Sequence, residues 1–400
     1  MTMEPVSGEY NRLSQILPAI KGLGILMVLI YHLWGYSKGF LSFPEIIRQA
    51  NASSLGSIVN SILYFFCLLG QQGVHLFIIA SGFGLAASWW RKYGSEGQQD
   101  RAFSSVKFWK HRLARIFPLY WLAHGLALLL LWIQPRWIPF GTGNIFNWSA
   151  IKVGVALIAS LTTLRNFLFE YYYFLNGAWW YIGLAVQLYL VFPVLIWVGK
   201  RWGWSILLAG TLLVSLVYRA TIVALPLDEM ATDVLIRGAI FIPRVFEFAF
   251  GMILAIALLE PRISTVEPCL NWSKNLLLSS RWIWLTGLMW VIGVAIDWTS
   301  AEAWIVLKIP SDQLIGVGEF CFIFQIISFL PLKKWLNIVG NYSYGIYLTH
   351  SNTYVALWLL LVKVVPSYWL RFCLVTVFSC LLGGLFELGW NWVLKNKIKT

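Results

Sequence analysis

Residues 17–37 read LPAIKGLGILMVLIYHLWGYS, an apolar run interrupted by one lysine, Lys21, and one histidine, His32. A helix needs about 20 mostly apolar residues to cross the hydrocarbon core of a bilayer. This run is therefore predicted to be a membrane-spanning helix. It lacks an obvious small-residue cleavage site, so we expect it to be a retained first helix rather than a signal peptide.

The rest of the chain repeats this character. Hydrophobic residues make up 59% of the 400 residues and charged residues 12%, against roughly 25% charged in a typical soluble domain. This composition excludes a soluble globular fold, disorder and a coiled coil. It predicts an all-α polytopic membrane protein of about ten transmembrane helices. The nine spans expected after the first are 60–88, 116–134, 178–199, 203–224, 238–259, 282–298, 313–331, 341–362 and 368–393.

Lysine and arginine decide the orientation, because they concentrate in cytoplasmic loops. With ten spans and a cytoplasmic N-terminus, 19 lysine and arginine residues fall on the cytoplasmic side of the membrane and 9 on the outer side. A further crossing by the short apolar run 151–168 would make the split 14 to 14. We therefore expect both termini in the cytoplasm and 134–177 to be an outer interfacial segment. Residues 1–400 are predicted to form a single membrane-embedded domain with no soluble domain.

The net charge of +13 fits cytoplasmic loops held against anionic lipid better than a nucleic-acid partner. The sequence contains no GxGxxG, Walker, GxSxG or HExxH motif. Its five cysteines form no CxxC pair and no metal-ligand spacing. We expect no metal site and no permanently bound cofactor.

Ionisable groups inside the bilayer are the most informative residues, because each costs about 2.5–3.5 kcal/mol to insert. Lys21 and His32 are eleven residues apart, almost three full turns, so they share one helix face about 16 Å apart. The spacing alone favours an anchoring lysine and a hydrogen-bonded core histidine over a catalytic pair. His75, His124 and His350 also fall in predicted spans.

Two more pairs have a spacing that brings their side chains together. Arg244 and Glu247 are three apart, so they can form an ion pair that lowers the cost of burial. Arg112 and Arg115 lie in an alternating basic and apolar stretch, 107–115, typical of an interfacial helix. That stretch either anchors the chain to anionic lipid or uses both guanidinium groups to hold a phosphate.

Six stretches, in order along the chain, resemble motifs of the acyltransferase-3 family of integral membrane acyltransferases. They include its Arg-Gly…Tyr-His first helix, its Arg-x-x-Arg-Ile-x-Pro-x-Tyr-Trp stretch and its closing Ser-Tyr-x-x-Tyr-Leu-x-His element. The six stretches here are Lys21–His32, Gly73–Phe83, Phe108–Trp121, Trp180–Pro193, Arg244–Gly251 and Gly340–His350. The chain departs from the family pattern at Lys21, where the family has Arg, at His75, where it has Asp, and at Ala185, where it commonly has Glu.

The resemblance implies an acyl-CoA-dependent O-acyltransferase that moves an acetyl or other short acyl group to a carbohydrate or glycolipid hydroxyl, as in polysaccharide O-acetylation. Acyl-CoA, most simply acetyl-CoA, is then a co-substrate with its phosphates at Arg112 and Arg115. His32 is the expected base, with Lys21 below it. His75, His350, Glu247 and Arg244 complete the expected site. The expected location is a bacterial inner membrane.

Two other functions fit the same residues. Histidine and arginine inside a membrane also occur in the proton relays of transporters, so an exporter of a small solute or glycan is the first alternative. The second is a catalytically silent protein that binds lipid or glycan. Consumption of acyl-CoA distinguishes the enzyme from both.

Overall fold

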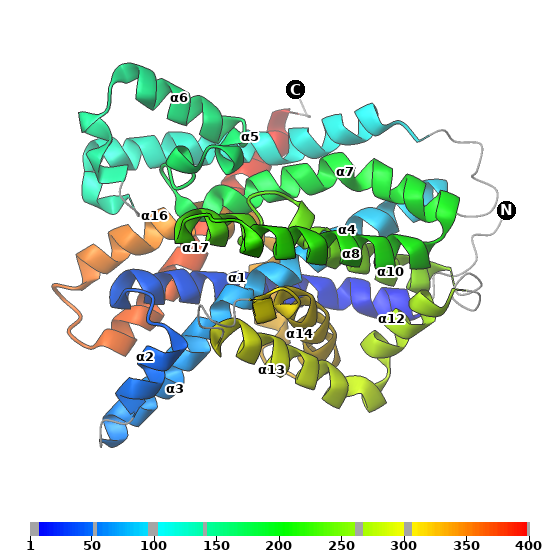
Figure 1. Cartoon of the computed structure of the whole chain (residues 1–400). Helices are drawn as coiled ribbons and strands as arrows, with labels where there is room; N and C mark the ends of the chain where they lie inside the picture. Colours follow the sequence, from blue (N-terminus) through cyan, green and yellow to red (C-terminus); the bar gives the residue numbers. More distant parts are fainter. Residues whose placement is uncertain are drawn as a thin grey trace. The chain divides into compact units, whose positions relative to one another are not determined.

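The computed structural model describes residues 8–50, 54–94, 103–138, 142–260, 267–299 and 306–397, and every regular element in these ranges is a helix (Figure 1). The chain divides into two compact units. Unit 1 comprises Met1–Lys21, Val74–Lys110 and Gln187–Asn337. Unit 2 comprises Gly22–Gly73, His111–Val186 and Ile338–Thr400.

Four helices contribute several residues to both units: α1 (Gly8–Lys38), α5 (Ser105–Ile133), α7 (Trp180–Trp202) and α15 (Lys333–Asn341). Helix α4 (Gly73–Tyr93) belongs to unit 1 except for its first residue, Gly73, and each of the other helices belongs to one unit. The other helices of unit 1 are α4 (Gly73–Tyr93), α8 (Trp204–Ala224), α9 (Glu229–Arg237), η7 (Ile242–Arg244), α10 (Val245–Leu259), α12 (Pro268–Leu278), η8 (Ser280–Trp282), α13 (Ile283–Thr299) and α14 (Ser311–Ile327). The others of unit 2 are α2 (Phe43–Ala50), α3 (Leu55–Leu69), η1 (Gly70–Gln72), η2 (Pro135–Trp137), η3 (Thr142–Asn147), α6 (Ala150–Leu161), η4 (Leu164–Phe167), η5 (Phe169–Tyr171), η6 (Gly177–Trp179), α16 (Ser343–Leu361) and α17 (Tyr368–Lys397).

The predicted all-helical membrane fold is confirmed, but the predicted number of spans is not. Within the described ranges, eight helices are long and apolar enough to cross a bilayer. The two predicted spans outside this set, 313–331 and 341–362, coincide with α14 and α16. Helix α14 has only 17 residues, and α16 carries a run of polar residues from Thr349 to Thr353.

The run at 151–168 forms the 12-residue helix α6 and then the short helix η4. Twelve helical residues extend about 18 Å, well short of the roughly 30 Å hydrocarbon core. This length fits the prediction that the run does not cross. The side of the membrane on which it lies stays a prediction.

Helix α10 forms the centre of unit 1 and packs against α8, α12 and α14. All its residues from Val245 to Leu258 are buried. Gly82 of α4 and Gly251 of α10 let these two helices cross in contact. A Cβ atom added to Gly82 would lie 2.0 Å from the Phe248 carbonyl oxygen, and one added to Gly251 would lie 2.1 Å from the Ile79 carbonyl oxygen. Small residues allow such close backbone packing between membrane helices.

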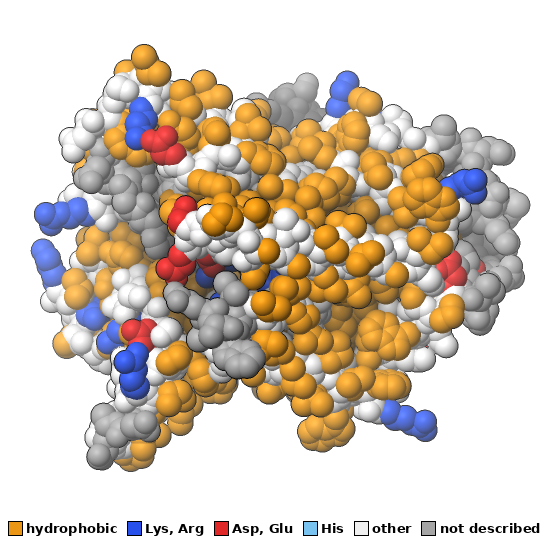
Figure 2. Space-filling model, in the orientation of Figure 1, with side chains coloured by type: hydrophobic (Ala, Val, Ile, Leu, Met, Phe, Trp, Pro, Cys, Tyr) orange, Lys and Arg blue, Asp and Glu red, His pale blue; other side chains and the backbone are white. Residues whose placement is uncertain are grey.

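Apolar side chains cover the faces of unit 1 that do not pack on other helices. Helix α8 exposes Leu213 and Val217, and α13 exposes Trp284 and Val291, each by more than half of its surface. Figure 2 shows hydrophobic side chains along both helices, with few charged groups among them. A surface of this kind is suited to lipid, since lipid tails are as apolar as the side chains themselves.

Candidate functional site

In unit 2, the structure brings together two of the histidines singled out from the sequence. The imidazole rings of His32 on α1 and His350 on α16 have their centroids 5.4 Å apart at an angle of 45°. His350 is completely buried, whereas His32 is partly exposed. Phe40 and Tyr31 lie edge-on to the His32 ring. A titratable imidazole thus lies beside a second one in a mostly apolar setting.

Hydrogen bonds engage both ring nitrogens of His350. Its Nδ1 lies 2.7 Å from the carbonyl oxygen of Tyr347, and a carbonyl oxygen can only accept, so Nδ1 carries a proton. Its Nε2 lies 3.3 Å from the hydroxyl of Ser351, which can donate to this nitrogen or accept from it. The Tyr347 carbonyl oxygen and the Ser351 hydroxyl therefore orient the His350 ring.

The helix that carries His350 is fixed by bonds on both sides of this residue. The indole Nε1 of Trp179 donates to the Leu348 carbonyl oxygen at 2.9 Å, and the Asn176 side chain donates to Asn352 Oδ1 at 3.0 Å. The Tyr347 hydroxyl donates to the carbonyl oxygen of Ala178. The position of the His350 ring is therefore determined by the loop and helix at 176–179.

A second buried histidine in unit 2, His124, is part of the scaffold. Its Nδ1 donates to the Tyr120 carbonyl oxygen at 2.9 Å, and its Nε2 accepts from the Ser160 hydroxyl at 2.8 Å. Arg165 donates to the same hydroxyl at 3.1 Å and to the Asn176 carbonyl oxygen at 3.0 Å. Both ring nitrogens are engaged, so His124 holds the 160–176 segment in place.

Lys21 lies on the same helix as His32, three turns earlier, and is partly buried. It belongs to unit 1 and His32 to unit 2. That the two side chains share one face of α1 stays a prediction from their eleven-residue spacing.

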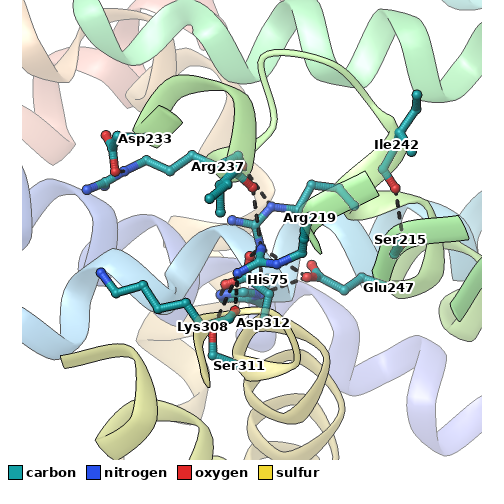
Figure 3. A network of polar contacts seen from close by, with 12 residues as sticks. His75, Ser215, Arg219, Asp233, Arg237, Ile242, Glu247, Lys308, Ser311 and Asp312 are labelled. Atoms are coloured by element: carbon teal, nitrogen blue, oxygen red, sulfur yellow. Dashed lines mark hydrogen bonds and ion pairs between the residues drawn. The ribbon is translucent and has the colours of Figure 1, made fainter. Parts of the chain in front are cut away.

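In unit 1, the structure gathers three of the predicted residues, His75, Arg244 and Glu247, into one buried network (Figure 3). Arg244 donates from Nη1 to Glu247 Oε1 at 3.0 Å, which confirms the ion pair expected from their spacing. His75 Nδ1 lies 3.2 Å from the same oxygen. Asp312 of α14 adds a second carboxylate, with its Oδ2 3.0 Å from Arg244 Nη1.

Arg219 of α8 completes this network, hereafter the unit 1 cluster: His75, Arg219, Arg244, Glu247 and Asp312. Arg219 pairs with Asp312 and also donates to the carbonyl oxygen of Lys308. The exposed fraction of all five residues is 7% or less. Burial of so many charges is tolerated only because each is paired.

The glycine crossing of α4 and α10 explains why these side chains meet. His75 lies seven residues, about two turns, before Gly82, and Glu247 lies four residues before Gly251. His75 and Glu247 therefore each share a helix face with the glycine that allows the close approach. Gly316 of α14 gives further room, since a Cβ atom there would lie 3.1 Å from Glu247 Cγ.

Sequence reasoning missed Arg219, Asp312 and a third buried acid, Glu319 of α14. Arg219 lies inside the predicted span 203–224 and Glu319 inside 313–331, and Asp312 lies one residue before the second of these spans. The rule that singled out Arg244 and Glu247, an ionisable group within a bilayer, applies equally to Arg219 and Glu319. Arg219 and Asp312 pair with each other across 93 residues of sequence, so spacing could not identify them.

The predicted phosphate-binding pair lies on α5, in the part that belongs to unit 2. Arg115 is exposed and Arg112 is partly buried. Arg115 lies within electrostatic range of Glu387 on α17, which accepts a hydrogen bond from the backbone nitrogen of Gly345 at 2.7 Å. Arg115 is therefore open to solvent, and the Glu387 carboxylate lies near enough to offset part of its positive charge.

The described residues contain no cluster of three or more His, Cys, Asp or Glu side chains arranged to hold a metal ion. Their chemistry is that of imidazole bases, guanidinium groups and carboxylates. A comparison with known families matches the acyltransferase-3 model, described as an acyltransferase domain, to residues 16–388. No curated protein and no solved structure matches the chain. Because the match covers nearly the whole sequence, the chain belongs to the acyltransferase-3 family, and it is an integral membrane acyltransferase.

Proposed function

We propose that this protein moves an acetyl or other short acyl group from acyl-CoA to a hydroxyl of a carbohydrate or carbohydrate-containing lipid, and that it does so in a bacterial inner membrane. The observation that carries the proposal is the placement of His32. It lies on the family's first-helix element, partly exposed, with its ring centroid 5.4 Å from that of His350. A partly exposed imidazole can reach a substrate, which a fully buried one cannot.

In the proposed reaction, His32 accepts the proton of the acceptor hydroxyl as its oxygen attacks the thioester carbonyl carbon. A carbon–oxygen bond forms and the carbon–sulfur bond to CoA breaks. The imidazolium then returns the proton to the leaving thiolate, so the products are the ester and free CoA. Imidazole suits this exchange because its ordinary pKa lies near neutrality.

His350 is the residue that positions this base in the proposal. Its Nδ1 donates to the Tyr347 carbonyl oxygen, and the proposed mechanism requires its Nε2 to be unprotonated, so that the ring is uncharged. A neutral imidazole beside His32 tolerates the transient imidazolium, whereas a second cation would oppose it. Lys21, on the same face of α1, supplies positive charge toward the cytoplasmic end of that face.

The donor is proposed to bind at Arg112 and Arg115. Residues three apart on a helix present their side chains to the same side, and paired guanidinium groups match the oxygen atoms of a phosphate. In the absence of the donor, the negative charge of Glu387 offsets part of the positive charge of Arg115. This arrangement favours release of CoA after transfer, because Glu387 competes with the phosphate for Arg115.

The test uses purified protein in nanodiscs with acetyl-CoA labelled in the acetyl group and a panel of soluble glycans and glycolipids. The proposal expects label in an ester of the acceptor, with release of one CoA per ester. The same protein in liposomes tests the transporter alternative. Movement of an unmodified solute without consumption of acetyl-CoA would contradict the proposal, and so would acetylation of amines only.

A further inference from the structure

The backbone that follows helix α1 is strained next to the proposed base. Helix α1 ends at Lys38, and the two residues after it both have a positive φ, 85° at Gly39 and 54° at Phe40. A glycine with positive φ is a common way to end a helix, and the Gly39 N–H donates to the Gly35 carbonyl oxygen at 2.8 Å. The same conformation is an outlier for a residue as bulky as phenylalanine. The end of the helix does not require it, so other contacts of Phe40 must compensate for the strain.

The contacts of the Phe40 ring supply that compensation. Its centroid lies 5.2 Å from that of Tyr31 and 6.5 Å from that of His32, and the Phe40 and His32 rings are almost perpendicular, at 86°. Edge-to-face ring pairs at such separations are favourable. The ring also lies directly on Gly35, since a Cβ atom added there would be 2.0 Å from Phe40 Cε1. The positive φ therefore turns Phe40 back onto the helix, beside the proposed base.

The Phe40 ring covers part of the helix face that carries His32. Gly35 lies three residues after His32, so the two residues are neighbours on that face. Gly35 is buried, whereas Phe40 above it is partly exposed. His32 also stays partly exposed, so one approach to its ring remains open. Phe40 accordingly closes one side of the base and leaves another side accessible.

A cover of this kind has a chemical consequence for the acyl transfer proposed above, because water can take the place of the acceptor. His32 then accepts a proton from water, the water oxygen attacks the thioester carbonyl carbon, and the carbon–sulfur bond breaks. The imidazolium returns its proton to the leaving thiolate, so the products are acetic acid and free CoA. This hydrolysis consumes the donor without modifying an acceptor. Enzymes suppress such side reactions by excluding water from the site.

We propose that Phe40 is a specificity-determining residue of this site, because its ring excludes water from one side of His32 and presents an apolar face to the acceptor. The inference rests on the proposed function, in which His32 accepts the proton of the acceptor hydroxyl. A carbohydrate carries C–H groups next to its hydroxyl groups, so it can pack against the ring, whereas water has no apolar surface to place there. The positive φ of Phe40 and the missing side chain of Gly35 hold the ring in position.

The test makes two measurements on two variants of the purified full-length protein in nanodiscs. Phe40→Gly removes the ring and should fold, because glycine adopts a positive φ readily. Gly35→Ala keeps the ring but displaces it, because the added Cβ atom would overlap it. The matched controls are Gly125→Ala on α5, where a Cβ atom meets nothing within 4 Å, and Phe146→Gly, which removes an exposed ring.

The first measurement is the rate at which diethyl pyrocarbonate modifies His32, followed by mass spectrometry. This measurement does not depend on acyl transfer. Phe40→Gly and Gly35→Ala should each raise the rate several-fold, because the reagent gains the side of the imidazole that the ring covers, and neither control should change it. An unchanged rate in a folded variant of either kind would overturn the inference.

The second measurement is the ratio of acetyl-CoA hydrolysed to ester formed, with a glycan that the wild type acetylates. Both variants should raise this ratio several-fold, whereas loss of a merely structural ring would lower the two products together. An unchanged ratio at a raised modification rate would overturn the role of Phe40 in specificity. Failure of the proposed function itself has a different signature: the wild type would form no ester with any acceptor, while the modification of His32 would still respond to both variants.

Discussion

Replacing Asp312 with Asn should destabilise unit 1 more than any other single change of charge in it. Asp312 is the carboxylate that Arg219 contacts in the described structure, and it also lies 3.0 Å from Arg244. After the change, two buried guanidinium groups share only one paired carboxylate, that of Glu247. Removal of one partner from a buried ion pair costs about 3–5 kcal/mol, because the other charge is left uncompensated.

The matched control is Asp233→Asn, which removes the carboxylate from the i, i+4 pair with Arg237 on α9. Both side chains of that pair are more than 40% exposed. Exposed helical pairs contribute about 0.3–0.5 kcal/mol, so this variant should resemble the wild type. Figure 3 shows the two pairs in the same view, with Asp233 and Asp312 on different helices.

The assay is unfolding of each variant in mixed micelles by increasing SDS, followed by circular dichroism and compared with the wild type. The free energy of unfolding should fall by about 3–5 kcal/mol for Asp312→Asn and by less than about 1 kcal/mol for Asp233→Asn. Equal losses for the two variants would refute the claim that the unit 1 cluster depends on Asp312 for charge compensation.

Four further predictions test other parts of the account. Gly82→Ala should destabilise the protein by about 1–3 kcal/mol through overpacking against α10, whereas Gly84→Ala, which meets no atom within 4 Å, should be tolerated; equal melting temperatures would contradict the crossing. Arg112→Ala or Arg115→Ala should weaken acyl-CoA binding by about 1.5–3 kcal/mol in calorimetry with nanodiscs, and unchanged binding in the double variant would mean that the stretch is only a lipid anchor. Lys21→Arg should retain or increase acyl transfer. Loss of transfer at unchanged expression would mean that Lys21 does not have the role of the arginine that the family carries at this position. Reporter fusions after Lys200 and after Thr400 should both report cytoplasm, and an outer signal at Lys200 would place a crossing at 151–168.

The sequence was sufficient for the helical membrane fold and the family, because both depend on local features. Length and hydropathy of each run predict a span. The ion pair of Arg244 and Glu247 could be predicted for the same reason, since three residues on one helix determine the distance. The number of spans was less predictable. Helix α14 is short for a membrane span, and α16 carries polar residues in its middle.

The unit 1 cluster could not be assembled from the sequence. Its members come from α4, α8, α14 and the consecutive helices η7 and α10, and these four parts are far apart along the chain. Their meeting depends on a backbone contact between Gly82 and Phe248, and no periodicity in either helix specifies its partner. The neighbourhood of His32 and His350, which are 318 positions apart, was unpredictable for the same reason. What could have been predicted is that Arg219 and Glu319 need partners, since both are ionisable groups in apolar runs.

The most direct test of the central claim is acyl transfer by a His32→Gln variant, measured as labelled ester formed from acetyl-CoA by protein in nanodiscs. Glutamine keeps much of the volume of histidine but cannot take a proton from a hydroxyl. The control is His111→Gln on α5, which changes an exposed histidine. The account predicts that His32→Gln folds and binds acyl-CoA normally but forms no ester, while His111→Gln has the activity of the wild type. Ester formation by a well-folded His32→Gln protein at the wild-type rate would contradict the account.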